Sequence, residues 1–515
     1  MKIDGNTNNQ PDVILVQPPY EGPYNFWKSE NLGMGYLASS LESKGYSVEI
    51  LDAFLLDMSI DEVVTKLAEN PPRLLLGFSI LSYQLYRTAQ IVLMLIREKG
   101  INVHVTIGSW FPTFWSEQIV AENNSINSIV KGDGEIAITM LVDFLKVGKW
   151  EVGHEHMLQI SNIRDVMVLS SISGPAELDM LPHPRRDYFN EVLKQYHLIT
   201  SHTSRGCGHN SCTFCSVPAF YHNHESHRFR SAENVIEEIG LIPKDGGDFI
   251  FFTDEDFIGG TRQSQIRAAD IFEGISSKSA KVRFAINCPV KEVDKKLFLR
   301  LKDSGLAAAY IGIESHQARY LRRFGKGVRP DEVDKTVNVL NELGVKIVPG
   351  WIMFERDTTF LEIKESLDYL RSIETYHVNY LKSLYVMKDT LMEKIYQKNL
   401  YKTFFYSKYF FKDPQVDLLV RIITNDYLPE VMPYTNAIYP IWHKLLGGFG
   451  TDQQQQEFNY INRTIRDLSF NFLEEVMGRI RLNSLDGLTH ELSWQVTEWE
   501  KIAGKINELA FSLGH

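Results

Sequence analysis

Cysteine is scarce in this sequence, and its scarcity already excludes one class of protein. The 515 residues contain four cysteines, too few to staple a chain of this length, so a disulfide scaffold is excluded. No run of about 18 apolar residues is present, and we therefore expect no membrane span. The opening segment MKIDGNTNNQ lacks the apolar core of a signal peptide. These absences predict a protein of the reducing cytoplasm, where neighbouring cysteines usually serve metal or redox chemistry.

Positive charge is also in deficit. Lysine and arginine total 54 against 65 acidic residues, which gives a net charge of −11. An acidic chain without a basic tail is a poor partner for nucleic acid or an anionic membrane. Hydrophobic residues make up 44% and charged residues 23%, which is ordinary for a globular protein and argues against disorder. The length predicts about three domains.

Apolar runs and helical patterns alternate over residues 11–150. The runs are short enough to be buried strands, and the segments between them have helical spacing. This alternation is typical of βαβ units and predicts a doubly wound, Rossmann-like α/β domain with its ligand at the carboxyl ends of the strands. The five predicted strands are residues 12–16, 47–51, 74–79, 103–107 and 126–130.

A second alternating series follows a mixed, weakly periodic segment, residues 151–195, which we interpret as a linker. Over residues 196–390, six apolar runs are separated by helical patterns. They predict a parallel sheet curled into a full or partial (β/α)6 barrel. The six predicted strands are residues 196–201, 248–253, 282–288, 307–313, 346–354 and 379–386.

Residues 391–515 differ from the rest in composition. They are rich in Tyr, Phe and Leu with helical periodicity, as in residues 465–482, and the polar run 453–456 is expected to be a loop. We expect a C-terminal helical domain that covers the barrel mouth. A stabilising appendage without contact to substrate is an equal alternative.

Three of the four cysteines, Cys207, Cys212 and Cys215, lie within nine residues, directly after the first strand of the second series. Three thiolates can hold an iron–sulfur cluster and leave one iron open, since such clusters normally take four cysteines. The alternative is a structural zinc site. Its fourth ligand would come from His209, His222, His224 or His227. Spacing alone does not decide, but the top of a βα barrel is where active sites lie, which favours the cluster.

The cysteine segment resembles the radical S-adenosylmethionine (SAM) superfamily, and residues 11–390 resemble its subfamily with a cobalamin-binding domain. The usual spacing in that family is CxxxCxxC, whereas this chain has CxxxxCxxC, with the family's aromatic residue present as Phe214. The resemblance implies a [4Fe–4S] cluster on Cys207, Cys212 and Cys215 that binds SAM and cleaves it reductively. The resulting 5′-deoxyadenosyl radical abstracts hydrogen from an unactivated carbon, which is then methylated with the help of cobalamin.

Further segments are similar to the family's SAM-binding strand ends: FTDEDF at 252–257, GIES at 312–315 and PGW at 349–351. The acidic residues have an alternative role as helix caps. Three basic residues follow, Arg322, Arg323 and Lys326. The resemblance implies that one of them neutralises the SAM carboxylate, and a solvated basic face is the equal alternative. The resemblance implies SAM contacts for Phe214, Asp254, Glu255, Glu314, Ser315, Lys326 and Gly350.

Small residues at the predicted strand ends of the first domain match the family's cobalamin-binding pattern, because they let a flat corrin approach the backbone. The sequence has no DxHxxG motif, so no lower axial histidine is offered by that route. Trp110 also departs from the pattern, and would either crowd the corrin or pack over its lower face. A domain that kept its fold without the cofactor is the alternative. The implied cobalamin contacts are Gly35, Ser79, Gly108, Ser109, Trp110, Pro112, Thr113, Gly132 and Glu135.

The fourth cysteine, Cys288, ends the third predicted barrel strand. It is either a buried structural cysteine or a catalytic, substrate-facing thiol. As a whole, the resemblance implies a cobalamin-dependent radical SAM methyltransferase. Its substrate would be a small molecule, such as a natural-product intermediate, or a peptide, and its electron donor a flavodoxin or ferredoxin. The alternatives are a radical SAM cyclase or rearrangement enzyme without methyl transfer, and a zinc-stabilised binding module.

Overall fold

The structure is a computed structural model in which the chain forms two compact units. The first unit consists mainly of residues 30–188, and the second of residues 189–218 and 227–515. The described residues are 10–21, 28–122, 125–172, 177–221, 227–242, 249–278, 282–376, 380–402, 407–484 and 488–514.

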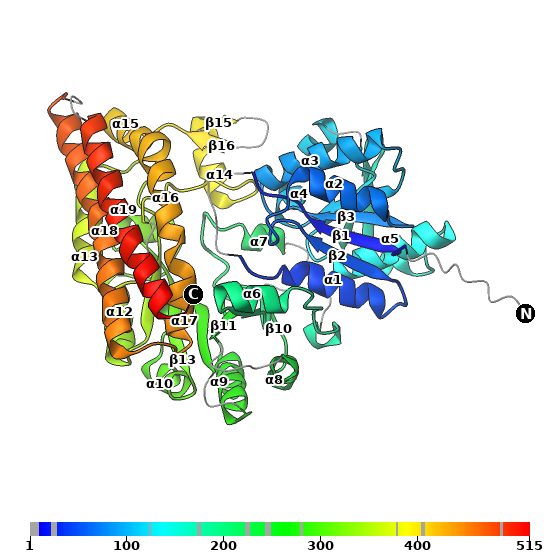
Figure 1. Cartoon of the computed structure of the whole chain (residues 1–515), viewed down its shortest axis with the longest axis horizontal. Coiled ribbons are helices and arrows are strands. Elements are labelled where there is room, and N and C mark those ends of the chain that lie inside the picture. The colour runs from blue at the N-terminus through cyan, green and yellow to red at the C-terminus, as the bar shows by residue number, and fades with distance from the viewer. Residues whose placement is uncertain are drawn as a thin grey trace, which may run out of the picture. The chain divides into compact units, whose positions relative to one another are not determined.

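The first unit is built on a sheet whose strands lie in the order β2-β1-β3-β4-β5-β7-β6. Figure 1 shows three of them, β1, β2 and β3, side by side. All neighbours are parallel except the pair β6 and β7. The five predicted strands are confirmed as β1 Val13–Gln17, β2 Val48–Asp52, β3 Leu75–Ser79, β4 His104–Gly108 and β5 Ser128–Lys131. The strand order reverses between β1 and β3, because β2 lies on one side of β1 and the later strands lie on the other. Ligands of doubly wound sheets bind at such a point.

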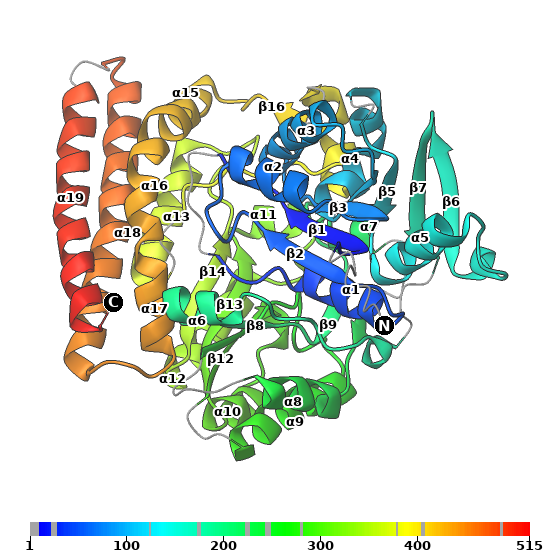
Figure 2. The same ribbon diagram turned by 45° about the vertical axis from the view of Figure 1, so that its right-hand side comes forward.

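The segment interpreted as a linker contributes two strands to this sheet. Leu158–Ile163 (β6) and Val166–Ser171 (β7) form an antiparallel hairpin, and β7 pairs with β5. Figure 2 shows the hairpin at the edge of the sheet. Val166 and Val168 are buried two residues apart, the period of a strand with one face in the core. That signal is too short to stand out in a mixed segment.

Five helices connect the strands of the first unit. Apolar side chains of α1 and α5 pack against β1 and β3 in one core that contains Val13, Leu15 and Leu141. The helix α2 begins with a capping box in which Ser59 and Glu62 bond reciprocally. The helices are α1 Leu32–Glu42, α2 Ile60–Glu69, α3 Tyr83–Glu98, α4 Trp110–Glu122 and α5 Glu135–Val147.

The second unit is built on a parallel sheet of five strands in the order β14-β13-β12-β11-β8. They are β8 Ile199–Ser201, β11 Phe249–Phe252, β12 Arg283–Pro289, β13 Leu306–Glu314 and β14 Lys346–Trp351. The sixth predicted run, 379–386, begins outside the described residues. In its described part it makes only a bridge between Ser383 and Phe354, because Met353 and Phe354 both donate their N–H to the carbonyl of Lys382.

Helices cover the outer face of this sheet, where aromatic rings pack closely. Phe272 of α9 lies 4.3 Å from Phe284 of β12 between ring centroids, and Phe252 of β11 lies 6.0 Å from Phe272. All three are fully buried. The helices between the strands are α8 Ala232–Leu241, α9 Arg262–Lys278, α10 Lys295–Asp303, α12 Pro330–Glu342 and α13 Phe360–Ser372.

The helix α17 (Ile438–Leu446) packs on the opposite, inner face of the same sheet. Trp442 lies 6.0 Å from Tyr310 of β13, and His443 stacks on Phe249 of β11 at 5.7 Å. A parallel sheet that does not close into a barrel leaves its inner face in need of apolar cover, which α17 supplies. The C-terminal region thus fills the inside of the sheet as well as extending beyond it.

Four of the other C-terminal helices, α15, α16, α18 and α19, form a layer in which α18 and α19 lie side by side (Figure 2). The expected loop at residues 453–456 is wrong: these residues form the first turn of α18, since Thr451 and Gln454 make a capping box. No described helix is long and apolar enough to cross a membrane. The elements are α14 Leu391–Tyr396, β15 Leu400–Lys402, β16 Ser407–Tyr409, α15 Pro414–Ile422, α16 Leu428–Asn436, α18 Asp452–Arg481 and α19 Leu488–Ser512.

Candidate active site

A cavity of about 570 Å³ opens at the carboxyl ends of the strands of the second sheet. Residues in the carboxyl-terminal halves of β12, β13 and β14 line it, among them Asn287, Tyr310 and Val348. All three clustered cysteines lie on its wall, and so does Cys288. The site predicted from the cysteine spacing therefore coincides with the place where parallel α/β sheets carry ligands.

The cysteine loop begins at a short hairpin of β9 (Ser204–Gly206) and β10 (His227–Phe229). Asn210, within the longer spacing between the first two cysteines, takes a left-handed conformation with φ of 43°, which asparagine tolerates better than most residues. His209 beside it accepts a bond from Lys291 at 2.7 Å, and its other ring nitrogen lies 2.8 Å from the Gly325 carbonyl. The extra residue is thus absorbed in an anchored turn.

Burial raises the pKa of the thiols of Cys207, Cys212 and Cys215, to about 12 for Cys207 and about 11 for Cys215. Nearby charges modify this effect: the carboxylate of Asp256 raises the pKa of Cys207 further, and the ammonium of Lys326 lowers that of Cys212. Without metal the thiols are therefore protonated at neutral pH. Thiolates are the metal-binding form, so loading of this site releases protons.

The loop is held by the end of α11 (Ala318–Arg323) and the start of α14. Thr213 donates its N–H to the Phe324 carbonyl at 3.0 Å and its hydroxyl to the Arg323 carbonyl at 2.8 Å. Its own carbonyl accepts the N–H of Met392 at 2.7 Å. The ring of Phe214 packs edge-on against Phe324 at 5.5 Å. Residues more than 100 positions away thus fix the backbone between Cys212 and Cys215.

The described part of the chain contains no three His, Cys, Asp or Glu side chains that converge on a single metal ion. Of the four histidines considered as zinc ligands, His222 and His224 lie outside the described residues. His209 is hydrogen-bonded at both ring nitrogens, and His227 stacks on Phe229 at 4.0 Å. Thiols spread over one cavity wall suit a cluster, whose cysteines bind different irons, better than a tetrahedral zinc ion.

Four of the residues predicted to bind SAM, besides Phe214, line the same cavity: Glu255, Glu314, Lys326 and Gly350. Glu314 sits at a bulge of β13 with φ of 66°, and its carboxylate lies 3.7 Å from the ammonium of Lys326. A Cβ atom on Gly350 would lie 3.1 Å from Glu314 Oε1. The absence of a side chain at Gly350 therefore provides the space that the Glu314 carboxylate occupies beside Lys326.

Two other predicted SAM contacts do not line the cavity. Asp254 is fully buried, and its carboxylate accepts bonds from the N–H and the hydroxyl of Thr203 at 3.1 and 2.8 Å. Ser315 is buried, and its hydroxyl accepts the N–H of Gln317. Both side chains hold the backbone near the cysteine loop or β13.

In the first unit, a polar cluster lies where the strand order of the sheet reverses, between β1 and β3. The amide of Asn31 donates to Gln17 Oε1 at 2.6 Å and to the hydroxyl of Ser79 at 3.1 Å. Gln17 ends β1, Ser79 ends β3, and Asn31 caps α1. Sequence reasoning found Ser79 alone, because Gln17 and Asn31 carry no motif of their own. Their position at the end of a strand and at a helix cap was the available signal.

Small groups continue along this edge. Ser79 is in register with Gly108, and Ser109 follows in a left-handed conformation with φ of 87°. The hydroxyl of Thr113 donates to the Ser109 carbonyl at 2.7 Å and accepts the N–H of Gly132 at 3.0 Å. Adjacent strand ends thus present partly accessible backbone and hydroxyl groups, which fit a flat macrocycle with amide side chains.

The other predicted cobalamin contacts take part in packing, and their contact with cobalamin stays a prediction. A Cβ atom on Gly35 would lie 2.5 Å from the Arg185 carbonyl, so this glycine permits a close backbone contact. Trp110 stacks on Phe220 at 4.2 Å. Pro112 is buried in α4, and Glu135 is buried at the start of α5.

Comparison with known families agrees with the description of both the first unit and the cavity of the second unit. The model of the B12 binding domain matches residues 28–142, and that of the Radical SAM superfamily matches residues 201–370. The chain is a B12-binding radical SAM enzyme. Its cofactors are a [4Fe–4S] cluster, SAM and cobalamin. The expected fold class, a Rossmann-like domain, a parallel radical SAM sheet and C-terminal helices, is confirmed.

The relatives of this radical SAM enzyme differ in their names. It is 25% identical to "Uncharacterized methyltransferase PH0819" of Pyrococcus horikoshii, over 82% of this chain and 90% of that protein. It is 24% identical to "4'-phospho-dehydrooxetanocin synthase" of Priestia megaterium, over 79% of this chain and 56% of that protein. Its fold is similar to that of the cobalamin-dependent enzyme OxsB with aqua-cobalamin and SAM bound, with a TM-score of 0.72, 20% identity, and coverage of 98% of this chain and 80% of that one.

Sequence reasoning missed several residues of the enzyme's cavity: Asn287, Tyr310, Lys382 and Tyr439. Asn287 and Tyr310 lie on the inward face of predicted strands, so strand parity was an available signal. Tyr439 comes from α17 and Lys382 from the segment after α13, and no pattern in the sequence places either beside the cysteines. Tyr439 also brings the C-terminal region into contact with the cavity.

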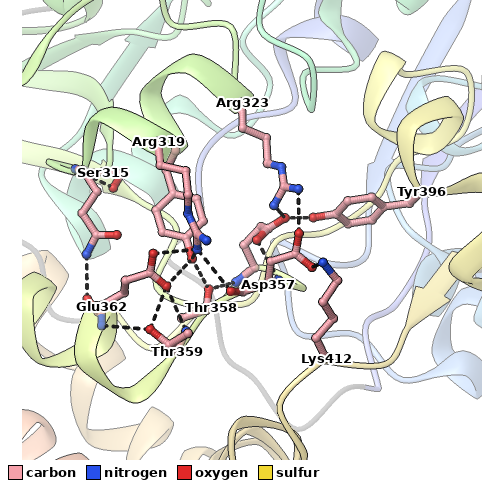
Figure 3. Close-up of polar contacts among 12 residues, drawn as sticks. Ser315, Arg319, Arg323, Asp357, Thr358, Thr359, Glu362, Tyr396 and Lys412 are labelled. Atoms are coloured by element: carbon pink, nitrogen blue, oxygen red, sulfur yellow. Dashed lines mark hydrogen bonds and ion pairs between the residues drawn. The ribbon is translucent and has the colours of Figure 1, made fainter.

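A network of ion pairs holds α11 in place (Figure 3). The guanidinium of Arg323 forks between Glu355 and Asp357, at 2.6 Å to each. Tyr396 of α14 donates to the same Glu355, and Lys412 lies 3.0 Å from Asp357. Arg323, considered as a partner of the SAM carboxylate or part of a solvated face, instead joins α11 to the loop after β14 and to the C-terminal region.

Cys288 lines the cavity, and its side chain is buried. Its thiol donates to the carbonyl of Pro289 at 3.2 Å, and burial raises its pKa well above the ordinary value. Its catalytic role stays a prediction.

Proposed function

We propose that this enzyme cleaves SAM at a [4Fe–4S] cluster held by Cys207, Cys212 and Cys215, and methylates an unactivated carbon of a small molecule or peptide. The observation that carries this proposal is the placement of the three thiols and the Glu314–Lys326 pair on one cavity at the carboxyl ends of the strands. When bound, the cluster supplies the electron that cleaves SAM, and cobalamin supplies the methyl transfer.

The chain's own residues bind, orient and shield. Glu314 and Lys326 present one negative and one positive group to the cavity beside Cys212, which matches the ammonium and carboxylate of the methionine part of SAM. The amide nitrogen of Asn287 donates to the Asp254 carbonyl at 2.8 Å, and its oxygen can accept a bond from a polar group in the cavity. Tyr310 and Tyr439 add aromatic rings to the wall. Such a wall excludes water, as a reactive radical requires.

Reconstitution under anaerobic conditions tests this function. We expect iron, sulfide and a broad absorption near about 400 nm, together with corrinoid in the purified protein. With a reductant such as reduced flavodoxin, we expect 5′-deoxyadenosine from SAM. Protein without iron and sulfide after reconstitution would contradict the proposal and favour the zinc-stabilised module.

A reaction without methyl transfer is the second candidate, because one relative is named a synthase. Product analysis with a turned-over substrate separates the two. Methylation yields S-adenosylhomocysteine together with 5′-deoxyadenosine, whereas a cyclisation or rearrangement yields 5′-deoxyadenosine without S-adenosylhomocysteine.

Gly350→Val tests the SAM end of the cavity. A side chain here displaces the Glu314 carboxylate from Lys326, and we expect the Kd for SAM to rise at least about tenfold, or roughly 1.4 kcal/mol. Equilibrium dialysis on the reconstituted enzyme measures it. Gly478→Val in α18 is the matched control, because nothing lies near its added Cβ. Equal Kd values in both variants would place SAM elsewhere.

A further inference from the structure

Lys382 is a cavity residue whose backbone is fixed. It follows α13, and its carbonyl accepts the N–H groups of Met353 and Phe354 at 3.1 and 3.2 Å. Its own N–H donates to the Tyr380 carbonyl at 2.9 Å. The side chain lines the same cavity as the three clustered cysteines. These bonds tie the lysine to the end of β14, so its place at the cavity is set by the fold.

Two lysines line the cavity, and only Lys326 of the two lies within ion-pair distance of a carboxylate among the described residues. Lys326 faces Glu314 at 3.7 Å, and Glu255 accepts the N–H of Gly206. Within the described part of the chain, the Lys382 ammonium has no ion pair or hydrogen bond, although the charge of Glu314 acts on it from beyond ion-pair distance. The side chain is exposed to the open cavity, and partial desolvation by the surrounding protein lowers the pKa of Lys382.

An ammonium group that has lost part of its hydration without gaining a counter-ion is unfavourable, and an incoming anion removes that cost. Of the other groups near this lysine, the Glu314 carboxylate is offset by Lys326 at 3.7 Å, and the two phenols of the cavity do not repel an anion. Burial raises the pKa of Tyr310 and raises that of Tyr439 to about 12, so both phenols are neutral hydrogen-bond donors at physiological pH.

The two lysines of the cavity therefore have different partners. Lys326 lies beside Cys212 and Glu314, at the end where SAM meets the cluster. The ammonium of Lys382 can therefore bind another molecule in the cavity. We propose that Lys382 binds an anionic group, a carboxylate or a phosphate, of the substrate that occupies the cavity together with SAM. The inference rests on the proposed function and narrows its substrate class to acids or phosphorylated compounds.

Local chemical labelling tests this inference on the anaerobically reconstituted enzyme. The protein is pulsed with limiting isotope-labelled acetic anhydride, and acetylation of Lys382 is measured by peptide mass spectrometry, with exposed Lys295 as the internal control. With SAM bound, we expect inorganic phosphate or acetate to slow labelling of Lys382 several-fold and saturably, and to leave Lys295 unchanged. SAM alone should leave Lys382 reactive. The Lys382→Met variant should bind SAM with an unchanged Kd.

Three results would overturn the inference. Protection of Lys382 by SAM alone would assign the anion to the SAM carboxylate. Labelling that neither phosphate nor acetate slows at about 100 mM, far above the Kd of a specific anion site, would show that no anion binds there. A tenfold weaker SAM Kd in Lys382→Met would place this lysine at the SAM end. Failure of the proposed function would be seen separately, because the reconstituted wild-type protein would then contain no iron or would not bind SAM.

Discussion

Cys212→Ala is expected to abolish both the cluster and the cleavage of SAM. A site with three cysteines has no spare ligand, and the other cysteine on the cavity wall, Cys288, is bonded to the carbonyl of Pro289. Two remaining thiolates hold a cluster poorly and leave no defined open iron. We expect iron per chain to fall to the background of an unreconstituted sample. 5′-Deoxyadenosine formation should fall at least about 1,000-fold, roughly 4 kcal/mol in the barrier.

Cys288→Ala is the matched control, and iron content and electron paramagnetic resonance are the measurements. We expect this variant to keep the full iron content and the spectrum of the wild type, since we assign Cys288 no bond to the cluster. Iron retained in Cys212→Ala with SAM cleavage intact would show that the ligand assignment is wrong. Iron lost in both variants would mean that Cys288 is a fourth ligand, which would leave no open iron for SAM.

The strand ends of this enzyme could be predicted because local sequence marks them. An apolar run indicates each parallel strand, and the residues at the end of that run lie at the carboxyl edge of the sheet. Cys207, Glu255, Glu314 and Gly350 all follow this rule and meet at one cavity. Ser79 and Gly108 follow it in the first sheet. A motif that lies within a few residues of a strand end is therefore visible before the structure is known.

Two classes of residue could not be placed in this way. Lys382 and Tyr439 reach the cavity from segments that follow the last strand, and their position depends on how α17 fills the inner face of an open sheet. Asp254 shows the reverse case, because a carboxylate at a strand end can bind the backbone instead of lining the cavity. Sequence spacing gives the position of a group along a strand, and packing decides which partner it meets.

Arg323→Met is expected to weaken the cluster site from a distance. Breaking the fork to Glu355 and Asp357 leaves Glu355, which is 1% exposed, without a cationic partner at its ion pair. Its remaining donors are the Tyr396 hydroxyl and the Asp357 N–H. Removal of one partner of such a pair costs about 3 kcal/mol. The cost falls on α11, whose last carbonyls hold Thr213 of the cysteine loop. We therefore expect faster loss of iron under mild chelation, and an altered electron paramagnetic resonance spectrum, in a protein that is still folded by circular dichroism.

Arg323→Lys and Arg329→Met separate positioning from simple destabilisation. Lysine keeps the charge but cannot fork to two carboxylates, so it should restore the unfolding free energy in part and the spectrum incompletely. Arg329 pairs with Asp331 at the surface, and its replacement should leave iron retention and the spectrum unchanged. If Arg323→Met lowers the thermal midpoint while its cluster keeps the wild-type spectrum and chelation rate, the network stabilises the fold without positioning the cysteine loop. A changed spectrum with a wild-type thermal midpoint would instead place the whole effect at the cluster, through the two carbonyl bonds that α11 makes to Thr213.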